Sequence, residues 1–172
     1  MANRPGMKVG DVEHNVQNDM LTVGSKAPDF TLRTTSHKPK TLADYAGKVK
    51  IISCIPSVDT GVCAAQTRRF NVEASKLSKD IVIVVISMDL PAAQKRWCGA
   101  AGVDQVMTVS DVVKADFGKK YGTLMKEVRL LRRAVFVVDK QGIVTYAAYM
   151  PTNKDEPNYA EVLAAAKKAL EM

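Results

Sequence analysis

Runs of apolar, β-branched residues alternate with segments of helical periodicity from about residue 48 onward. The almost unbroken apolar run Ile81–Met88 is typical of a strand that is covered on both faces. Gly24 and Pro28 mark turns between the shorter runs near the N-terminus. The predicted strands cover residues 20–23, 30–32, 48–55, 81–88, 106–109, 133–139 and 143–148.

Segments with apolar residues at three- and four-residue spacing predict helices between these strands. The predicted helices cover residues 62–78, 91–101, 111–121 and 159–170. Pro91 suits the first turn of its helix, and Gly102 suits the position that follows the last turn. Strands that alternate with helices, followed by a hairpin and a closing helix, predict an α/β fold: a mixed central sheet flanked by helices in a three-layer sandwich. Because no repeat or long linker divides the chain, we expect residues 1–172 to form a single domain.

The composition sets broad limits on function. The 172 residues are 47% hydrophobic and 25% charged, as in ordinary globular proteins. No apolar stretch approaches the roughly 20 residues that span a bilayer, and the first residues lack the apolar core of a secretory signal, so we expect a cytoplasmic protein. The formal net charge is +7, but the basic residues are mixed with acids and lack interleaved aromatics. This pattern favours a solvated basic surface over a nucleic-acid groove.

Three cysteines are the first chemical signal: Cys54, Cys63 and Cys98. A reducing cytoplasm disfavours a structural disulfide framework, which leaves catalytic, redox or core roles. No two of them are spaced as C-x-x-C, which argues against a thioredoxin-type redox pair and most zinc sites. Both histidines, His14 and His37, lie far upstream of Cys63, so spacing alone pairs neither with it.

The segment from Pro56 to Cys63 connects a predicted buried strand to the next helix. If that helix starts near Thr60, Cys63 lies in the first turn, close to backbone N–H groups that have no helical partner. The partial positive charge at a helix N-terminus favours the reactive thiolate. The Thr60 hydroxyl could bind the sulfur or a substrate oxygen, and Pro56 could shape the pocket without adding a donor. The alternative is an inert, buried Cys63.

These residues also carry a resemblance to a known family. Pro56, Thr60 and Cys63 match the Pro-x-x-x-Thr-x-x-Cys signature of the peroxiredoxins. The longer string PSVDTGVCAAQTRRFN resembles the bacterial thiol peroxidases, which are atypical two-cysteine peroxiredoxins. Three more stretches agree in order and spacing: APDFTL, SMDLPAAQKRWCGAAG and FGKKYGTLMKEVRLLRRAVFVVD. The resemblance extends from about residue 24 to the C-terminus and implies a thioredoxin-like fold.

The resemblance implies a role for each matched residue. Cys63 would attack the peroxide and become a sulfenic acid, and Cys98, at the resolving position, would then form an intramolecular disulfide with it. Arg133 matches the arginine that stabilises the thiolate and the charge developing on the peroxide. We expect the neighbouring Lys95 and Arg96 to favour the thiolate of Cys98. Without the resemblance, a packed helix cysteine beside Trp97 is the preferred alternative for Cys98.

Two residues near the motifs match no catalytic role, and one structural element expected from the resemblance has only a weak signal. Arg132 replaces a residue that is commonly small in the family, and we expect it to be a solvated charge that points away from Arg133. Cys54 is expected to be an inert core residue. The N-terminal hairpin of the subfamily is only weakly signalled in Met7–Val23, where apolar alternation is poor.

The function implied by the resemblance is a thiol-specific peroxidase for hydrogen peroxide and organic (alkyl) hydroperoxides. Such an enzyme is recycled by thioredoxin, serves antioxidant defence and forms a homodimer. No metal, haem or nucleotide cofactor is implied, and no glycine-rich phosphate loop is present. A redox sensor that passes its disulfide to a client protein would use the same residues, so that alternative stays open. A non-catalytic thioredoxin-like binding module would be expected to lack a motif residue, and none is missing.

Overall fold

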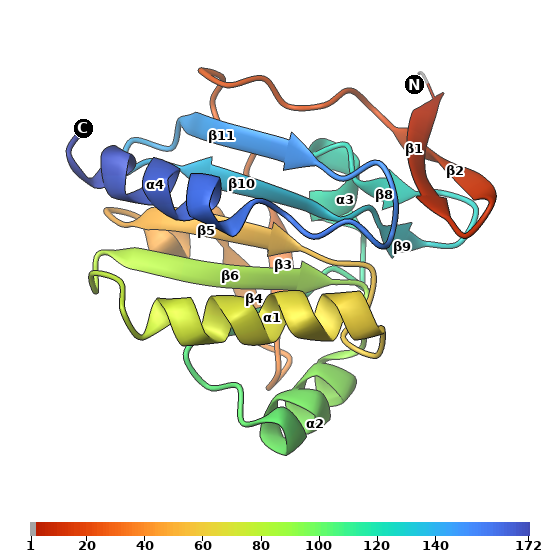
Figure 1. Cartoon of the computed structure of the whole chain (residues 1–172), viewed down its shortest axis with the longest axis horizontal. Coiled ribbons are helices and arrows are strands. Elements are labelled where there is room, and N and C mark those ends of the chain that lie inside the picture. Colours follow the sequence, from red (N-terminus) through yellow and green to blue (C-terminus); the bar gives the residue numbers. More distant parts are fainter. Residues whose placement is uncertain (1–2) are drawn as a thin grey trace.

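The computed structural model describes residues 3–172 and is built on a central mixed sheet with helices on both faces (Figure 1). The strands are β1 (Asn3–Val9), β2 (Val12–Gln17), β3 (Thr31–Thr34), β4 (Pro39–Thr41), β5 (Val49–Cys54), β6 (Ile81–Ser87), β7 (Met107–Ser110), β8 (Leu124–Met125), β9 (Leu130–Leu131), β10 (Ala134–Val138) and β11 (Val144–Tyr149). The helices are the 3-10 helix η1 (Leu42–Tyr45), α1 (Gly61–Ala74), α2 (Pro91–Ala101), α3 (Asp116–Lys120) and α4 (Tyr159–Leu170).

The central sheet has seven strands in the order β11-β10-β5-β6-β7-β3-β4. Strands β5, β6 and β7 are parallel, and the outer strands pair antiparallel. In the parallel pair β5–β6, Cys54 lies opposite Ile86. The two strands therefore end together, and the segments that lead from them into α1 and α2 leave the same edge of the sheet.

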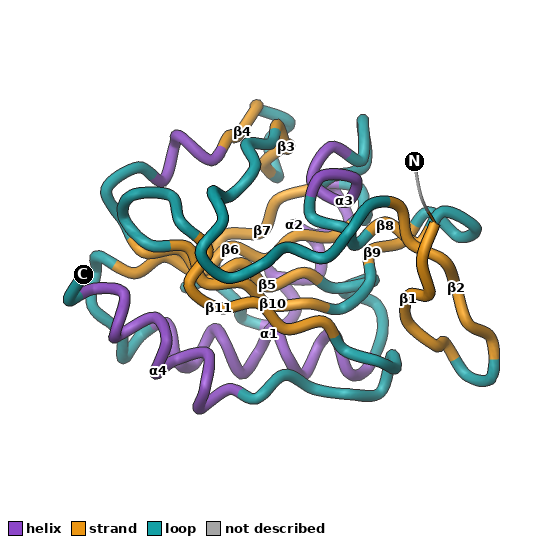
Figure 2. The backbone as a smooth tube through the Cα atoms, turned by 90° about the horizontal axis from the view of Figure 1, so that it is seen from above, coloured by secondary structure: helices purple, strands orange, loops and turns teal. Residues whose placement is uncertain are grey.

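Two apolar layers cover the two faces of this sheet. Figure 2 shows α1 and α4 on one face and α3 on the other. Alternation along β10 divides its side chains between the layers: Val135 and Val137 pack with the α1–α4 side, and Phe136 and Val138 pack with the α3 side. The predicted three-layer sandwich with a mixed sheet is therefore confirmed.

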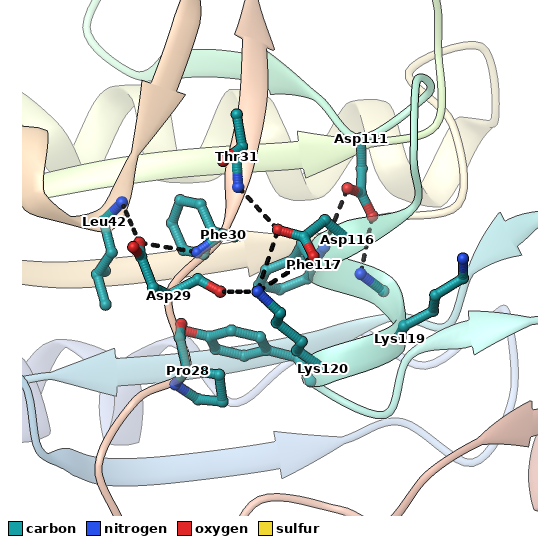
Figure 3. Close-up of polar contacts among 12 residues, drawn as sticks. Pro28, Asp29, Phe30, Thr31, Leu42, Asp111, Asp116, Phe117, Lys119 and Lys120 are labelled. Carbon is teal, nitrogen blue, oxygen red and sulfur yellow. Dashed lines mark hydrogen bonds and ion pairs between the residues drawn. The ribbon is translucent and has the colours of Figure 1, made fainter. Parts of the chain in front are cut away.

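The helix predicted over residues 111–121 is wrong in its first half, and only α3 is helical. The buried carboxylate of Asp111 accepts hydrogen bonds from the backbone N–H groups of Phe117 (3.0 Å) and Gly118 (2.8 Å), as Figure 3 shows. Ala115 has a left-handed φ of 51°, which interrupts any regular helix before Asp116. A side chain that bonds backbone amides across a turn competes with the helix it precedes.

The N-terminal region also differs from its prediction. The strand predicted at residues 20–23 is a loop in the structure. The weakly signalled hairpin is present, as β1 and β2, and continues through β8 and β9 in a second sheet of order β1-β2-β8-β9. Along the outer edge of β1, the amide of Lys8 donates to the Pro151 carbonyl (3.0 Å), and the amide of Asn153 donates to the Lys8 carbonyl (2.8 Å). The hairpin thereby contacts the loop that follows β11.

None of the helices within residues 3–172 combines the length and the apolar character that crossing a bilayer requires.

Candidate active site

Cys63 lies in the first turn of α1, as predicted from the sequence. Thr60 caps the helix with extended backbone angles (φ −96°, ψ 147°), and the first helical hydrogen bond runs from the Ala64 amide to the Thr60 carbonyl (2.9 Å). The amides of residues 61–63 therefore precede that bond and have no acceptor within the helix. The Cys63 side chain is fully buried beside these N–H groups, in a place where a negative charge on sulfur is stabilised.

Arg133 meets Cys63 from the opposite side, at the start of β10. Its Nη2 donates to the Cys63 sulfur (3.3 Å) and to the Asn153 carbonyl (3.0 Å), while Nη1 donates to Gln66 Oε1 (2.8 Å). Arg133 is 1% exposed, and none of its contacts in the described part of the chain is a carboxylate. The Cys63 sulfur is therefore a side-chain atom in direct contact with this buried guanidinium, together with the Gln66 amide oxygen.

Two residues that hold Arg133 were missed by reasoning from the sequence. Gln66 follows Cys63 by one helical turn, is fully buried, and its Nε2 also donates to Ser53 Oγ (2.8 Å). Its spacing from Cys63 on α1 was an available signal, because residues three apart share a helix face. The carbonyl of Asn153 had no signal in the sequence, because any residue supplies a carbonyl and only the tertiary structure brings this one to Arg133.

A cavity of about 330 Å³ lies at this site. Its walls are Val9, Pro56, Thr60, Gly61, Val62, Met125, Leu130, Arg133, Asn153 and Lys154. Pro56 and Thr60 are thus brought together with Arg133, as predicted. The Thr60 hydroxyl donates to the Ser57 carbonyl (3.2 Å). The side chains of Val9, Val62, Met125 and Leu130 make one apolar wall of this cavity.

Cys98 lies on α2 and faces a different cavity. Its sulfur is 3.8 Å from Thr108 Oγ1 on β7, and the cavity that it lines, of about 310 Å³, shares no residue with the one at Cys63. All three cysteines are unpaired. The structure therefore brings Pro56, Thr60, Cys63 and Arg133 together and leaves Cys98 apart from them.

The expectation that flanking cations favour the Cys98 thiolate is wrong for this arrangement. Burial raises the pKa of the Cys98 thiol, and the hydrogen bond with Thr108 opposes that rise only in part. Lys95 and Arg96 are exposed, and Arg96 forms an ion pair with Asp59 (3.5 Å). Solvent screens such exposed charges, so the loss of hydration at the sulfur outweighs them.

Arg132 is not the solvated charge that we expected. It is 8% exposed, its Nε donates to the Met150 carbonyl (3.0 Å), and its guanidinium lies 5.4 Å from the Tyr149 ring centre. Arg4, from the hairpin, lies 5.5 Å from the same ring. The hairpin therefore covers a position that a strand pattern alone would assign to solvent.

Cys54 is a core residue, as predicted. It is fully buried, and its thiol donates to the Arg132 carbonyl (3.3 Å). Burial raises the pKa of the Cys54 thiol far above its ordinary value, which keeps it protonated and unreactive. Within residues 3–172, no group of three or more His, Cys, Asp or Glu side chains is arranged to hold a metal ion.

A buried thiol at a helix N-terminus, in contact with a guanidinium on a thioredoxin-like sheet, is the site of the peroxiredoxin class of thiol peroxidases. The chain belongs to the Redoxin family, whose profile matches residues 22–163. The thiol peroxidase of Bacillus subtilis is 56% identical over 147 residues, which cover 86% of this chain and 87% of that protein. The thiol peroxidase of Oceanobacillus iheyensis is 55% identical over 141 residues, or 82% of this chain and 85% of that protein.

A solved structure agrees with this assignment. The crystal structure of a peroxiredoxin-like protein from Aquifex aeolicus superposes with a TM-score of 0.89 at 32% identity, and the match covers 97% of this chain and 98% of that one. The predicted fold and the predicted peroxidase activity are both confirmed by these relatives.

Proposed function

We propose that Cys63 is the peroxidatic residue and that Arg133, Thr60 and Pro56 form its catalytic surroundings. The Cys63 thiolate attacks the terminal oxygen of a hydroperoxide, the O–O bond breaks, and the leaving alkoxide or hydroxide takes a proton to become alcohol or water. Cys63 is thereby oxidised to a sulfenic acid. The observation that carries this proposal is the 3.3 Å contact between the Arg133 guanidinium and the Cys63 sulfur, because it stabilises both the thiolate and charge that develops on the peroxide.

The resolving residue in this proposal is Cys98. Its thiol attacks the sulfur of the Cys63 sulfenic acid, a disulfide forms and water leaves. Thioredoxin then reduces the disulfide and returns both thiols. The unpaired state of both cysteines is compatible with this cycle.

The substrate class that the cavity supports is organic hydroperoxides together with hydrogen peroxide. Val9, Val62, Met125 and Leu130 give the site an apolar wall against which an alkyl group would lose contact with water. Residues 1–172 act in this proposal as one peroxidase domain, in the cytoplasm, in antioxidant defence and as a homodimer. Neither nucleic acid nor a membrane is a partner.

A coupled assay tests this function. The protein is supplied with thioredoxin, thioredoxin reductase and NADPH, and the consumption of hydrogen peroxide is compared with that of cumene hydroperoxide. We expect steady turnover of both and a higher kcat/KM for the bulky substrate. Cys63→Ser should reduce consumption to the background rate, whereas Cys54→Ser, the matched control, should retain turnover. Activity retained in Cys63→Ser would exclude the assigned role, and oxidation that stops after one equivalent would indicate a sensor instead.

A further inference from the structure

The segments that carry the two proposed redox cysteines are joined at one carboxylate. Asp89 lies between β6 and α2, and its Oδ1 accepts a hydrogen bond from Ser57 Oγ (2.7 Å). Its Oδ2 accepts from the Val58 amide (2.9 Å) and from Ser87 Oγ (2.6 Å). We call this group of four residues the Asp89 junction. It fastens the loop before Cys63 to the residues from which the Cys98 helix begins.

The other contacts of helix α2 lie mainly in its first half and at Trp97. Only Pro91 and Gln94 are buried among its residues. Gln94 Nε2 donates to Ser87 Oγ (3.0 Å) and to the Val109 carbonyl (2.9 Å), so these contacts also lie in the first half of the helix. In the second half, Trp97 and Cys98 are half-buried, and Trp97 packs against the apolar cluster that includes Val58 and Cys63. Because no residue in the second half of α2 is fully buried, this half can open locally at a lower cost than the strands of the core.

Such separation is required by the geometry of the two sulfurs. Cys63 is fully buried against Arg133, whereas the Cys98 sulfur lies beside Thr108 in a different cavity. A disulfide requires the two Cα atoms to lie within about 7 Å and the two side chains to point toward each other. The first turn of α1 and the loop before it must therefore move relative to α2. Ser57 and Val58 lie in that loop, and both are bonded to the Asp89 carboxylate in this structure.

We propose that Asp89 is a positioning residue that sets the rate of disulfide formation, by holding the Cys63 loop and the Cys98 helix in the reduced arrangement. This inference rests on the proposed function of Cys63 and Cys98. The step concerned converts the Cys63 sulfenic acid and the Cys98 thiol to a disulfide: the S–S bond forms, the S–O bond breaks, and the oxygen leaves as water with the thiol proton. When disulfide formation is slow, the Cys63 sulfenic acid can react with a second peroxide, which oxidises it to a sulfinic acid.

Asp89→Asn is the decisive substitution, because it keeps the shape of the side chain but removes the charge and one acceptor atom. Asp59→Asn is the matched control: Asp59 also joins the Cys63 loop to α2, through Arg96 at 3.5 Å, but both side chains are more than half exposed (61% and 70%). Charge-assisted hydrogen bonds to a carboxylate contribute far more than an exposed ion pair. The two substitutions therefore separate the junction from simple loss of negative charge at this edge.

Stopped-flow fluorescence of Trp97, the sole tryptophan, follows the two steps after mixing with peroxide. The peroxide-dependent phase reports oxidation of Cys63, and the peroxide-independent phase reports disulfide formation. We expect Asp89→Asn to accelerate the second phase at least about tenfold, which corresponds to about 1.4 kcal/mol. The first phase should stay within about twofold, because Asp89 contacts neither the sulfur nor Arg133. Mass spectrometry should find less sulfinic acid at a given peroxide dose.

An unchanged or slower second phase in Asp89→Asn would overturn the proposal, and so would equal acceleration in Asp59→Asn. If Asp89→Asn does not fold, Ser57→Ala tests the proposal instead. It removes one of the three hydrogen bonds that the Asp89 carboxylate accepts, and it should still accelerate the second phase. Mass mapping of the disulfide separates failure of the proposed role of Cys98 from failure of the proposed role of Asp89. Absence of a Cys63–Cys98 disulfide in the unsubstituted protein would refute the role of Cys98 and the junction with it. A normal disulfide formed at the normal rate in Asp89→Asn would refute the junction alone.

Discussion

Asp111→Asn should make the folding stability of this protein less dependent on pH. Asp111 is 2% exposed, and its two carboxylate oxygens accept hydrogen bonds from the backbone amides of Phe117 and Gly118 at the start of α3 (Figure 3). Burial raises the pKa of Asp111 from its ordinary value of 3.8 to about 6, although the two backbone hydrogen bonds lower it in part. Between these two values, the folded chain binds the proton that the unfolded chain has released.

The sign and size of the effect follow from this difference. A group whose pKa is higher in the folded state than in the unfolded state contributes stability that is complete below about pH 4, and that contribution is lost as the pH rises through about 6. The full difference corresponds to about 3 kcal/mol. For a chain of this length it amounts to a change in Tm of roughly 6–12 °C. Asparagine does not titrate, so the variant should lack this component.

Urea unfolding of both proteins with reductant present, at several pH values from 4 to 7.5, measures the effect. The free energy of unfolding of the unsubstituted protein, minus that of Asp111→Asn, should fall by about 2 kcal/mol across this range, since part of the full difference is already lost at pH 4. Other titrating groups cancel in the difference. Asp80→Asn, at an exposed aspartate before β6, is the control and should leave the pH profile unchanged. A difference that is constant, or that rises with pH, would refute the assignment of a destabilising buried charge to Asp111.

Three further predictions concern the site. Cys98→Ser should still undergo one rapid peroxide-dependent oxidation, but its thioredoxin-driven cycle should fail unless a small thiol is added; sustained cycling in the coupled assay would contradict the resolving role. Lys8→Pro removes the amide that donates to Pro151, so it should loosen the loop that holds Arg133 and slow Cys63 oxidation about tenfold, whereas Lys8→Ala keeps that amide and should not. Val9→Asp places a charge in the apolar wall and should lower kcat/KM for cumene hydroperoxide about tenfold more than for hydrogen peroxide; equal losses would disprove the role of the wall.

The central sheet was predictable because its signals are local. The run Ile81–Ser87 is apolar on both faces, and α4 begins and ends at the predicted residues Tyr159 and Leu170. The placement of Cys63 in a first helical turn also followed from nearby residues, since Pro56 and Thr60 precede it on the same short segment. Local sequence decides such features because helix starts and buried strands are determined by neighbouring residues.

Other parts depend on residues that are distant in the chain. The β1–β2 hairpin has only weak alternation of apolar and polar residues. It is held by the contact of the Arg4 guanidinium with the Tyr149 ring and by the hydrogen bonds between Lys8 and the loop after β11. Arg132 is buried because the hairpin lies over it, and the hairpin also brings Val9 to the apolar wall of the cavity. No pattern within residues 3–23 contains these partners, because they lie more than a hundred residues away.

The sequence by itself determined the core strands and the helix that starts before Cys63, because each depends on short-range patterns, and its motifs supported the resemblance that implies the chemistry of the site. Only the tertiary structure decided what surrounds that thiol: Arg133 held by Gln66 and by the Asn153 carbonyl, and Cys98 turned toward a separate cavity. It also decided that Asp89 joins the two cysteine segments. The physical reason is that burial and hydrogen-bond partners are properties of the folded arrangement, whereas strand and helix signals are properties of the neighbouring residues.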